Sequence, residues 1–324
     1  MHALLHNLLL ELQSSDPQVL DGWKQILDLE IKAAAARPGP AIPQVRLKAA
    51  VVDRLQPPLE ARPSFEEHIE GLEKRKLRYY ATKNGGFLDL ARPAQIAFNF
   101  AASAAQINLT RPVLDVGNLE DLTLIALAPF LRRCGIFITH AFAAVRPFTA
   151  DSDSAAILLC GPPGCGKTTT GLSLIDQGWG FLANDAALLQ EAQGQINVCP
   201  SPGAINLHPK TISLLPAYRD LVDSDDQTIH NGKTVIPRGA LLAKITLAAP
   251  TAVQTILFPR ITDGRQHSLH EMSPAIGLAR LIEENVDRWD KYTYLEHIDL
   301  LTDLSRQAAF FDLHLARGQV FAMA

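Results

Sequence analysis

Apolar residues recur at helical spacing over the first part of the chain. Residues 1–12 are rich in leucine. Residues Ser14-Ser15-Asp16-Pro17 form a helix-start pattern, and Val19, Trp23 and Ile26 continue the helical spacing after it. We therefore expect helix over residues 1–35. The stretch 37–43 contains three prolines and a glycine, and it indicates a linker.

The pattern then alternates between helical and extended segments. Residues 45–55 fit a strand or a short helix, and residues 64–78 fit a helix because Ser64 and Glu67 form a capping-box pattern. Short apolar segments between turn residues predict strands over 86–90, 95–100 and 106–109. The apolar run 119–133, preceded by Asn118 and followed by Gly135, predicts a helix.

The remainder of the chain predicts strands that alternate with helices. The expected strands are 135–145, 155–160, 186–190, 195–198, 233–236, 243–249, 252–259 and 309–315, and the expected helices are 168–177, 274–289 and 295–308. This order indicates an α/β fold. We expect an N-terminal helical and small mixed α/β region over 1–118 and a second domain over 119–324.

Composition limits the classes of protein that the chain can belong to. It has 324 residues, 47% of them hydrophobic, and a net charge of −4, as in an ordinary globular protein. There is no basic stripe to bind nucleic acid, no apolar run long enough to span a membrane, and no signal-peptide pattern at the start. Four cysteines without a C-x-x-C pair indicate a reduced, cytoplasmic protein.

One stretch carries specific chemistry. Residues Gly161-Pro-Pro-Gly-Cys-Gly-Lys-Thr168 fit G-x-x-x-x-G-K-[ST], the Walker A pattern or P-loop, between a predicted strand and a predicted helix. The glycines let the backbone turn sharply and bring its N–H groups close to a polyphosphate. Lys167 supplies a charge for the β- and γ-phosphates, and Thr168 offers a hydroxyl to Mg²⁺. The stretch therefore predicts a nucleotide-binding site.

The order of features around this loop resembles the HPr kinase/phosphorylase family. A predicted strand with His140 precedes the loop strand, and a strand that ends in Phe181-Leu-Ala-Asn-Asp185 follows the loop helix directly. The resemblance runs from about residue 119 to residue 318. It implies the fold that this family shares with the carboxykinases that use phosphoenolpyruvate, and so an HPr-kinase-like nucleotide-binding domain over 119–324.

The resemblance also implies an activity and its residues. ATP and Mg²⁺ would be the cofactors, and the γ-phosphate would pass to a hydroxyl of a protein or peptide serine or of a small molecule. Asp185 would bind the metal with Thr168 or act as the base, His140 would lie against the phosphates, and Lys167 would neutralise charge. The predicted cofactor-binding residues are Gly161, Gly164, Cys165, Gly166, Lys167, Thr168 and Thr169.

One position departs from the family pattern. Family members carry an Asp-Asp pair where this chain has Asn184 and Asp185. An amide takes up no proton at neutral pH, so Asp185 or His140 would have to assist the acceptor. A non-catalytic nucleotide-binding regulatory or assembly protein is the alternative function. The acceptor and the choice of nucleotide base stay open, and a homo-oligomer is compatible with the sequence.

Four further residues have a functional and an ordinary interpretation. Lys233, Arg238 and Arg260 could bind phosphate, although most such side chains are solvated surface residues. Cys165 lies at the start of the loop helix beside Lys167, a setting that lowers a thiol pKa, or it is simply a tolerated loop residue.

Overall fold

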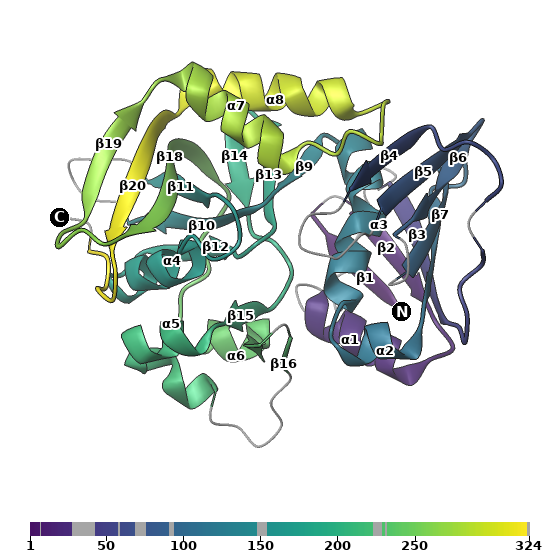
Figure 1. Cartoon of the computed structure of the whole chain (residues 1–324), viewed down its shortest axis with the longest axis horizontal. Coiled ribbons are helices and arrows are strands. Elements are labelled where there is room, and N and C mark those ends of the chain that lie inside the picture. Colours follow the sequence, from purple (N-terminus) through teal and green to yellow (C-terminus); the bar gives the residue numbers. More distant parts are fainter. Residues whose placement is uncertain are drawn as a thin grey trace. The chain divides into compact units, whose positions relative to one another are not determined.

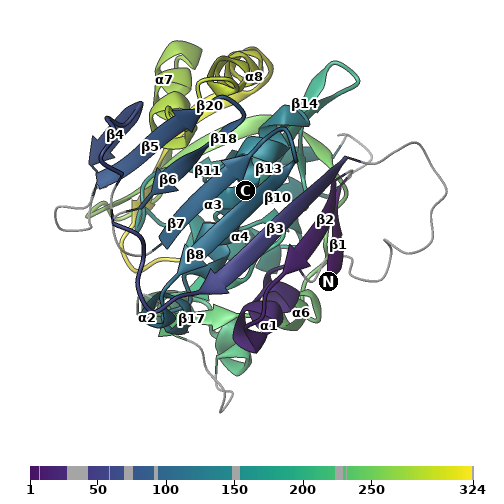
Figure 2. The same ribbon diagram turned by 90° about the vertical axis from the view of Figure 1, so that its right-hand side faces the viewer.

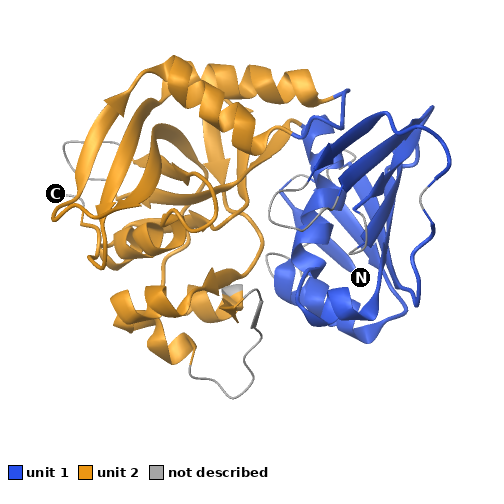
Figure 3. Ribbon diagram, in the orientation of Figure 1, with its two compact units in different colours: residues 1–134, 229–231, 287–292 blue, residues 135–228, 232–286, 293–324 orange. Residues whose placement is uncertain are grey.

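The computed structural model describes residues 1–6, 8–27, 43–57, 59–68, 76–90, 94–147, 154–222, 229–230 and 232–322. Contacts within the chain divide it into two compact units (Figure 3). Unit 1 contains residues 1–134, 229–231 and 287–292, and unit 2 contains residues 135–228, 232–286 and 293–324. Both units contain helices and strands, so the fold class is α/β, as predicted. The division falls after the helix over 119–133, whereas the sequence-based boundary lies before it.

Unit 1 is built on a single sheet of eight strands, seen face-on in Figure 2. Its spatial order is β1-β2-β3-β8-β7-β6-β5-β4, with parallel pairing of β2 with β3 and of β3 with β8, and antiparallel pairing elsewhere. The strands are β1 (His2–Leu5), β2 (Leu8–Gln13), β3 (Gln44–Val51), β4 (Phe65–His68), β5 (Lys76–Thr82), β6 (Gly85–Asp89), β7 (Ala94–Asn99) and β8 (Ala104–Leu109). The short β16 (Ile229–His230) also belongs to this unit.

Helices pack on this sheet through buried apolar side chains. They are α1 (Pro17–Ile26), α2 (Arg111–Asp115) and α3 (Leu119–Arg133). α3 contacts β7 and β8, and α1 packs against α3. Trp23 is fully buried between these elements, and its indole N–H donates a hydrogen bond of 2.9 Å to the Thr123 hydroxyl. A buried indole needs such a partner, so this bond fixes how α1 lies on α3.

Two stretches of unit 1 that were predicted as helix form strands, whereas Pro17–Ile26 of the helix predicted over 1–35 is helical. Within residues 1–12, the side chains of Leu8, Leu10 and Leu12 are buried while those between them are not, which is the two-residue period of a strand. The helix predicted over 64–78 is also wrong, because β4 and β5 form an antiparallel pair there. Residues 28–42, which hold most of the predicted linker, lie outside the described residues.

Unit 2 contains a nine-stranded mixed sheet and two strands, β15 and β17, of a small separate sheet. The main path is β12-β10-β11-β18-β14-β13-β9, and β20 lies between β18 and β19. The strands of the large sheet are β9 (Ile136–Thr139), β10 (Ala141–Arg146), β11 (Ala155–Cys160), β12 (Gly180–Ala183), β13 (Ala187–Ala192), β14 (Gln195–Cys199), β18 (Thr251–Thr262), β19 (Ser268–Met272) and β20 (Ala309–Ala316). The small pair is β15 (Ile205–Leu207) with β17 (Lys233–Ile236).

Helices cover both faces of the large sheet (Figure 1). They are α4 (Lys167–Asp176), α5 (Pro209–Leu214), the 3-10 helix η1 (Pro216–Leu221), α6 (Arg238–Leu242), α7 (Pro274–Asn285) and α8 (Tyr294–Gln307). Successive residues of β10 and β11 point into two different core clusters. In β11, Leu158 lies in the cluster that includes residues of α7 and α8, and Leu159 lies in the cluster that includes residues of α4. Alternation along a strand explains this, because neighbouring side chains point to opposite faces.

Most of the predicted elements of unit 2 are present, and two need correction. The strand predicted over 135–145 is two strands that break at His140, because β9 pairs with β13 whereas β10 pairs with β11 and β12. The strand predicted over 243–249 is wrong: α6 ends just before it, and only Leu247 forms an isolated bridge, to Phe181. Among the described helices, none is long and apolar enough to cross a bilayer.

Candidate functional site

Residues 161–166, here called the glycine loop, join the carboxyl end of β11 to the start of α4. Gly161, Gly164 and Gly166 have φ angles of 138°, 83° and 110°, in the region that favours glycine. At Gly166 a Cβ atom would also lie 2.8 Å from the Leu315 side chain. The loop needs glycine at these positions, and it leads into the N-terminus of α4, a position where backbone N–H groups can bind an anion.

Lys167 begins α4 and turns back over the loop. Only 5% of the residue is exposed, and its ammonium group donates hydrogen bonds to the carbonyl oxygens of Gly161 and Pro162. The same ammonium lies 3.0 Å from Nε2 of His140. Its carbonyl and imidazole partners carry no net negative charge, and the side chain lines the pocket, where an anion could approach it.

His140 is brought to the loop by the break between β9 and β10. Its Nδ1 lies 3.0 Å from the Asp185 carbonyl oxygen, which can only accept, so Nδ1 carries the proton. Nε2 is then unprotonated and accepts a hydrogen bond from Lys167. Burial, with the nearby charge of Lys167, lowers the pKa of His140, which favours this neutral form.

Asn184 and Asp185 occupy a second break, between β12 and β13. Because β10 pairs with β12 and β9 pairs with β13, the two breaks lie side by side. Asn184 is only 5% exposed; its Oδ1 accepts from the Thr168 hydroxyl at 3.1 Å, and its Nδ2 donates to Oδ2 of Asp185 at 3.2 Å. Asp185 has a φ of 61°, an uncommon backbone conformation for aspartate that its place between two strands imposes. The amide thus links the Thr168 hydroxyl to the Asp185 carboxylate.

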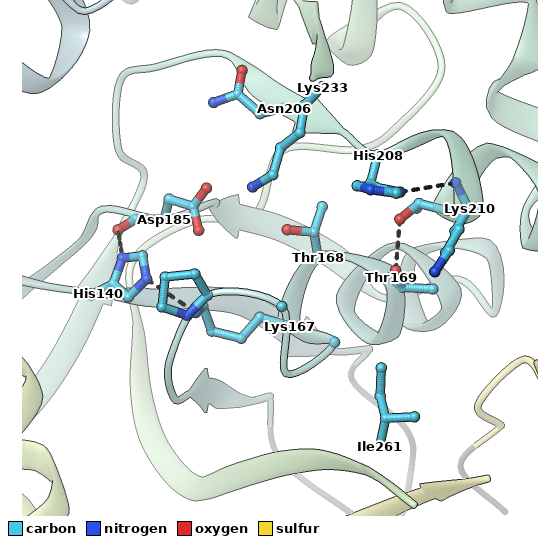
Figure 4. A pocket seen from close by; sticks show the side chains of 14 residues that line it. His140, Lys167, Thr168, Thr169, Asp185, Asn206, His208, Lys210, Lys233 and Ile261 are labelled. Carbon is cyan, nitrogen blue, oxygen red and sulfur yellow. Dashed lines mark hydrogen bonds between the residues drawn. The ribbon is translucent and has the colours of Figure 1, made fainter. Parts of the chain in front are cut away.

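These groups surround a pocket of about 380 Å³ within unit 2 (Figure 4). Its lining residues come from the glycine loop, α4, the strand breaks, β15, β17, α5 and β18: His140, Pro163, Gly164, Gly166, Lys167, Thr168, Thr169, Asp185, Asn206, His208, Lys210, Thr211, Lys233 and Ile261. Of the predicted site residues, Gly161 and Cys165 do not line it. The others are brought together around one cavity.

Three oxygen donors beside the glycine loop could hold a magnesium ion. The Thr168 hydroxyl, the Asn184 carbonyl and the Asp185 carboxylate are hard oxygen donors, and Mg²⁺ is commonly held by one or two carboxylates together with substrate phosphates and water. Over the part of the chain that the structure describes, no group of three or more His, Cys, Asp or Glu side chains could hold a metal by itself. Phosphate oxygens would have to complete such a site.

The other candidates from the sequence have different outcomes. Lys233 lines the pocket, whereas Arg260 contacts His314 on the neighbouring strand and does not line it. The side chain of Arg238 lies outside the described residues. The expected lowering of the Cys165 thiol pKa is wrong: burial raises this pKa and outweighs the opposing effect of Lys167.

Sequence reasoning missed two residues at the end of α7. The Asn285 side-chain oxygen accepts a hydrogen bond from the backbone N–H of His140. Glu284 lies close enough to the Gly161 N–H for a hydrogen bond to lower its pKa, but burial raises that pKa more. Both residues lie about 120 positions beyond the loop in the chain, where no local pattern signals contact with it.

Comparisons with known proteins do not identify the chain. No protein-family model matches it, and no curated protein matches its sequence.

Proposed function

We propose that unit 2 binds Mg·ATP at the glycine loop and transfers the γ-phosphate to a hydroxyl group. The observation that carries the proposal is the convergence of Lys167, Thr168, Asp185 and His140, from three separate places in the chain, on one cavity beside the glycine loop. Phosphoryl transfer requires charge neutralisation, metal binding and a base near the acceptor, and these four side chains supply such groups. The resemblance to HPr kinase/phosphorylase proteins supports the same activity.

The proposed step assigns one role to each group. The acceptor oxygen forms a bond to the γ-phosphorus as the bond to the bridging oxygen breaks, so that ADP leaves. Lys167 turns from the loop carbonyls to the phosphates, and the oxygens of Thr168, Asn184 and Asp185 would hold Mg²⁺, which supplies further positive charge. Asp185 takes the acceptor proton through its carboxylate, while the Nδ1–H of His140 stays hydrogen-bonded to the Asp185 carbonyl oxygen.

The first test is titration of the full chain with Mg·ATP, followed by mass spectrometry of the incubated nucleotide. We expect binding by the wild-type protein, formation of ADP, and affinity at least about tenfold weaker for Lys167→Ala, since a hydrogen bond to a charged group contributes about 1.5–3 kcal/mol. Absence of binding, or unchanged affinity in Lys167→Ala, would contradict the proposal.

A nucleotide-binding protein without transfer activity is the second candidate, and Asn184 is the observation that favours it. Asn184 holds Thr168 and Asp185 by hydrogen bonds without offering a base of its own. Binding of ATP that stays intact for hours would support this candidate. In Asn184→Asp two carboxyl groups would be adjacent, which raises the pKa of one of them and supplies a base. New ADP formation in Asn184→Asp alone would therefore indicate a kinase that has lost its activity.

A further inference from the structure

The pocket has a second wall, formed by β15, β17 and α5 opposite the glycine loop. Ile205, Leu207 and Ile236 of the strand pair are buried in the core cluster that includes residues of α4. Asn206 is paired with Val235, and residues directly opposite in an antiparallel pair share a face. Asn206 and Lys233 are therefore on the opposite face to those apolar residues, and both line the pocket.

Lys233 brings a positive charge to this wall that the described structure does not neutralise. Among the described residues, no ion pair or hydrogen bond of its ammonium group occurs. Figure 4 shows its side chain extending into the pocket toward Asp185. An ammonium group in this position is available to an anion.

The pocket has two ends of different chemistry. Asp185, His140 and Lys233 lie at one end, and Lys210 and Thr169 lie at the other (Figure 4). The Lys of this loop pattern reaches the β- and γ-phosphates. Because Lys167 contacts His140, the terminal phosphate of a bound nucleotide would lie at the Asp185 end. Lys210 would then face the phosphates nearer the nucleoside.

We propose that Lys233 is a catalytic residue that binds the terminal phosphate and neutralises charge on the phosphoryl group during transfer. The proposal rests on the function proposed above and adds a residue on the second wall to it. Lys233 keeps its proton throughout: the oxygen–phosphorus bond forms on one side of the phosphorus and breaks on the other, and the acceptor proton goes to Asp185. Two lysines on opposite walls would thus hold the group in transfer between them.

The test compares nucleotides with and without the terminal phosphate. Calorimetry of the full chain with Mg²⁺ would give dissociation constants for ADP and for a non-hydrolysable ATP analogue. For Lys233→Met we expect about tenfold or greater loss of affinity for the ATP analogue and less than about twofold for ADP. Lys210→Met is the matched control, and it should weaken the binding of ADP and of the ATP analogue by a similar factor. Lys233→Arg should keep most of the preference for the ATP analogue, because it keeps the charge.

The outcomes separate the two proposals. If the wild-type protein binds neither nucleotide, the proposed function fails and the role of Lys233 fails with it. If the wild-type protein prefers the ATP analogue and Lys233→Met keeps that preference, only the role of Lys233 is overturned. An equal loss of affinity for both nucleotides in Lys233→Met, with a native circular dichroism spectrum, would also overturn the role of Lys233. Such a result would place the ammonium away from the terminal phosphate.

Discussion

Glu284 is a carboxyl group beside a loop that we expect to bind anions. It is partly buried on α7, and its Oε2 has no hydrogen-bond partner within the described ranges. Burial and the neighbouring Glu283 raise its pKa, while Lys167, Arg280 and the Gly161 N–H lower it by a smaller amount. The buried thiol of Cys160 and the partly buried thiol of Cys165 also lie near it. A protonated Glu284 would leave the loop more positive than an ionised one.

The substitution Glu284→Gln tests this assignment through stability. A carboxyl group whose pKa is raised in the folded state contributes stability at low pH, and this contribution is lost as pH rises through the folded pKa. Glu284→Gln should therefore melt about 2 °C above the wild-type protein near pH 8 and lose this advantage near pH 4.5.

Thermal melts over this pH range would measure the effect. Exposed Glu283 provides the control: its charge acts on Glu284 only as a secondary cause, so Glu283→Gln should change the pH dependence of the melting temperature less than Glu284→Gln does. A difference between Glu284→Gln and wild type that does not change with pH would contradict the assignment.

Residues of the site differ in how visible they are in the sequence. Gly164, Gly166, Lys167 and Thr168 form a contiguous pattern whose chemistry follows from backbone conformation and charge, so it could be predicted locally. His140 and Asp185 were placed at the site only through the resemblance. Their proximity depends on two strand breaks that become adjacent when four strands pair. The contacts of Glu284 and Asn285 with the loop depend on long-range packing of α7.

At the scale of elements, the packing of α4 on β10 depends on a glycine in the middle of the helix. A Cβ atom at Gly171 would lie 2.2 Å from the ring of Phe142, which is fully buried. By intrinsic helix preference alone, alanine would be more stable than glycine at such a position. The absence of a side chain is instead what lets the helix approach the strand.

We therefore expect Gly171→Ala to destabilise the protein in spite of its better helix propensity. Overfilling a packed core costs about 1–3 kcal/mol, more than the helical gain of up to about 1 kcal/mol. Chemical denaturation would measure it. Adding Phe142→Leu should recover part of the loss by making room for the new methyl group. Losses that simply add in the double variant would count against the contact.

The elements that could be predicted are those whose pattern fits only one structure. The β11–loop–α4 unit has a strand, a loop pattern and a helical spacing that agree, and its boundaries were predicted to within about a residue. Residues 1–12 are ambiguous, because leucine favours helix and the two-residue alternation is short. The capping-box pattern at Ser64 was misleading: its hydroxyl accepts from the Ala81 N–H of β5, and Glu67 lies in β4 opposite Leu77.

At the scale of the whole chain, unit 1 is completed by a segment far from it in sequence. Residues 287–292 contribute Asp290, which is 1% exposed at its side chain and forms ion pairs with Arg132 and Arg133. Trp289 of the same segment stacks against Phe98 and lies 4.9 Å from Tyr79 between ring centroids. The segment therefore adds both charge and aromatic surface to the core of unit 1.

Removing one partner of this ion pair should be costly. In Asp290→Asn the guanidinium of Arg132, 4% exposed, would lose its buried counter-charge, and breaking such a pair costs about 3 kcal/mol. Asp287→Asn is the matched control, since Asp287 pairs with the same arginine but its side chain is 42% exposed. Its cost should stay below about 1 kcal/mol. Urea denaturation of both variants would measure the difference, and equal costs would contradict this account.

Composition and pattern were sufficient to predict the α/β class, because strands and helices alternate over most of the chain. They could not reveal that the chain leaves unit 1, forms most of unit 2 and returns. That path depends on Trp289 and Asp290, and a single tryptophan or aspartate near the end of a predicted helix gives no sign of which core it joins.

The returning segment has a consequence for how the protein is made. Residues 287–292 leave the ribosome on the order of ten seconds after residue 134, at usual rates of translation. During that interval the nascent unit 1 holds a buried arginine without its carboxylate and an aromatic cluster without its tryptophan. Its native fold is completed only when synthesis is nearly finished, so we expect the N-terminal half to depend on chaperones while the rest of the chain emerges.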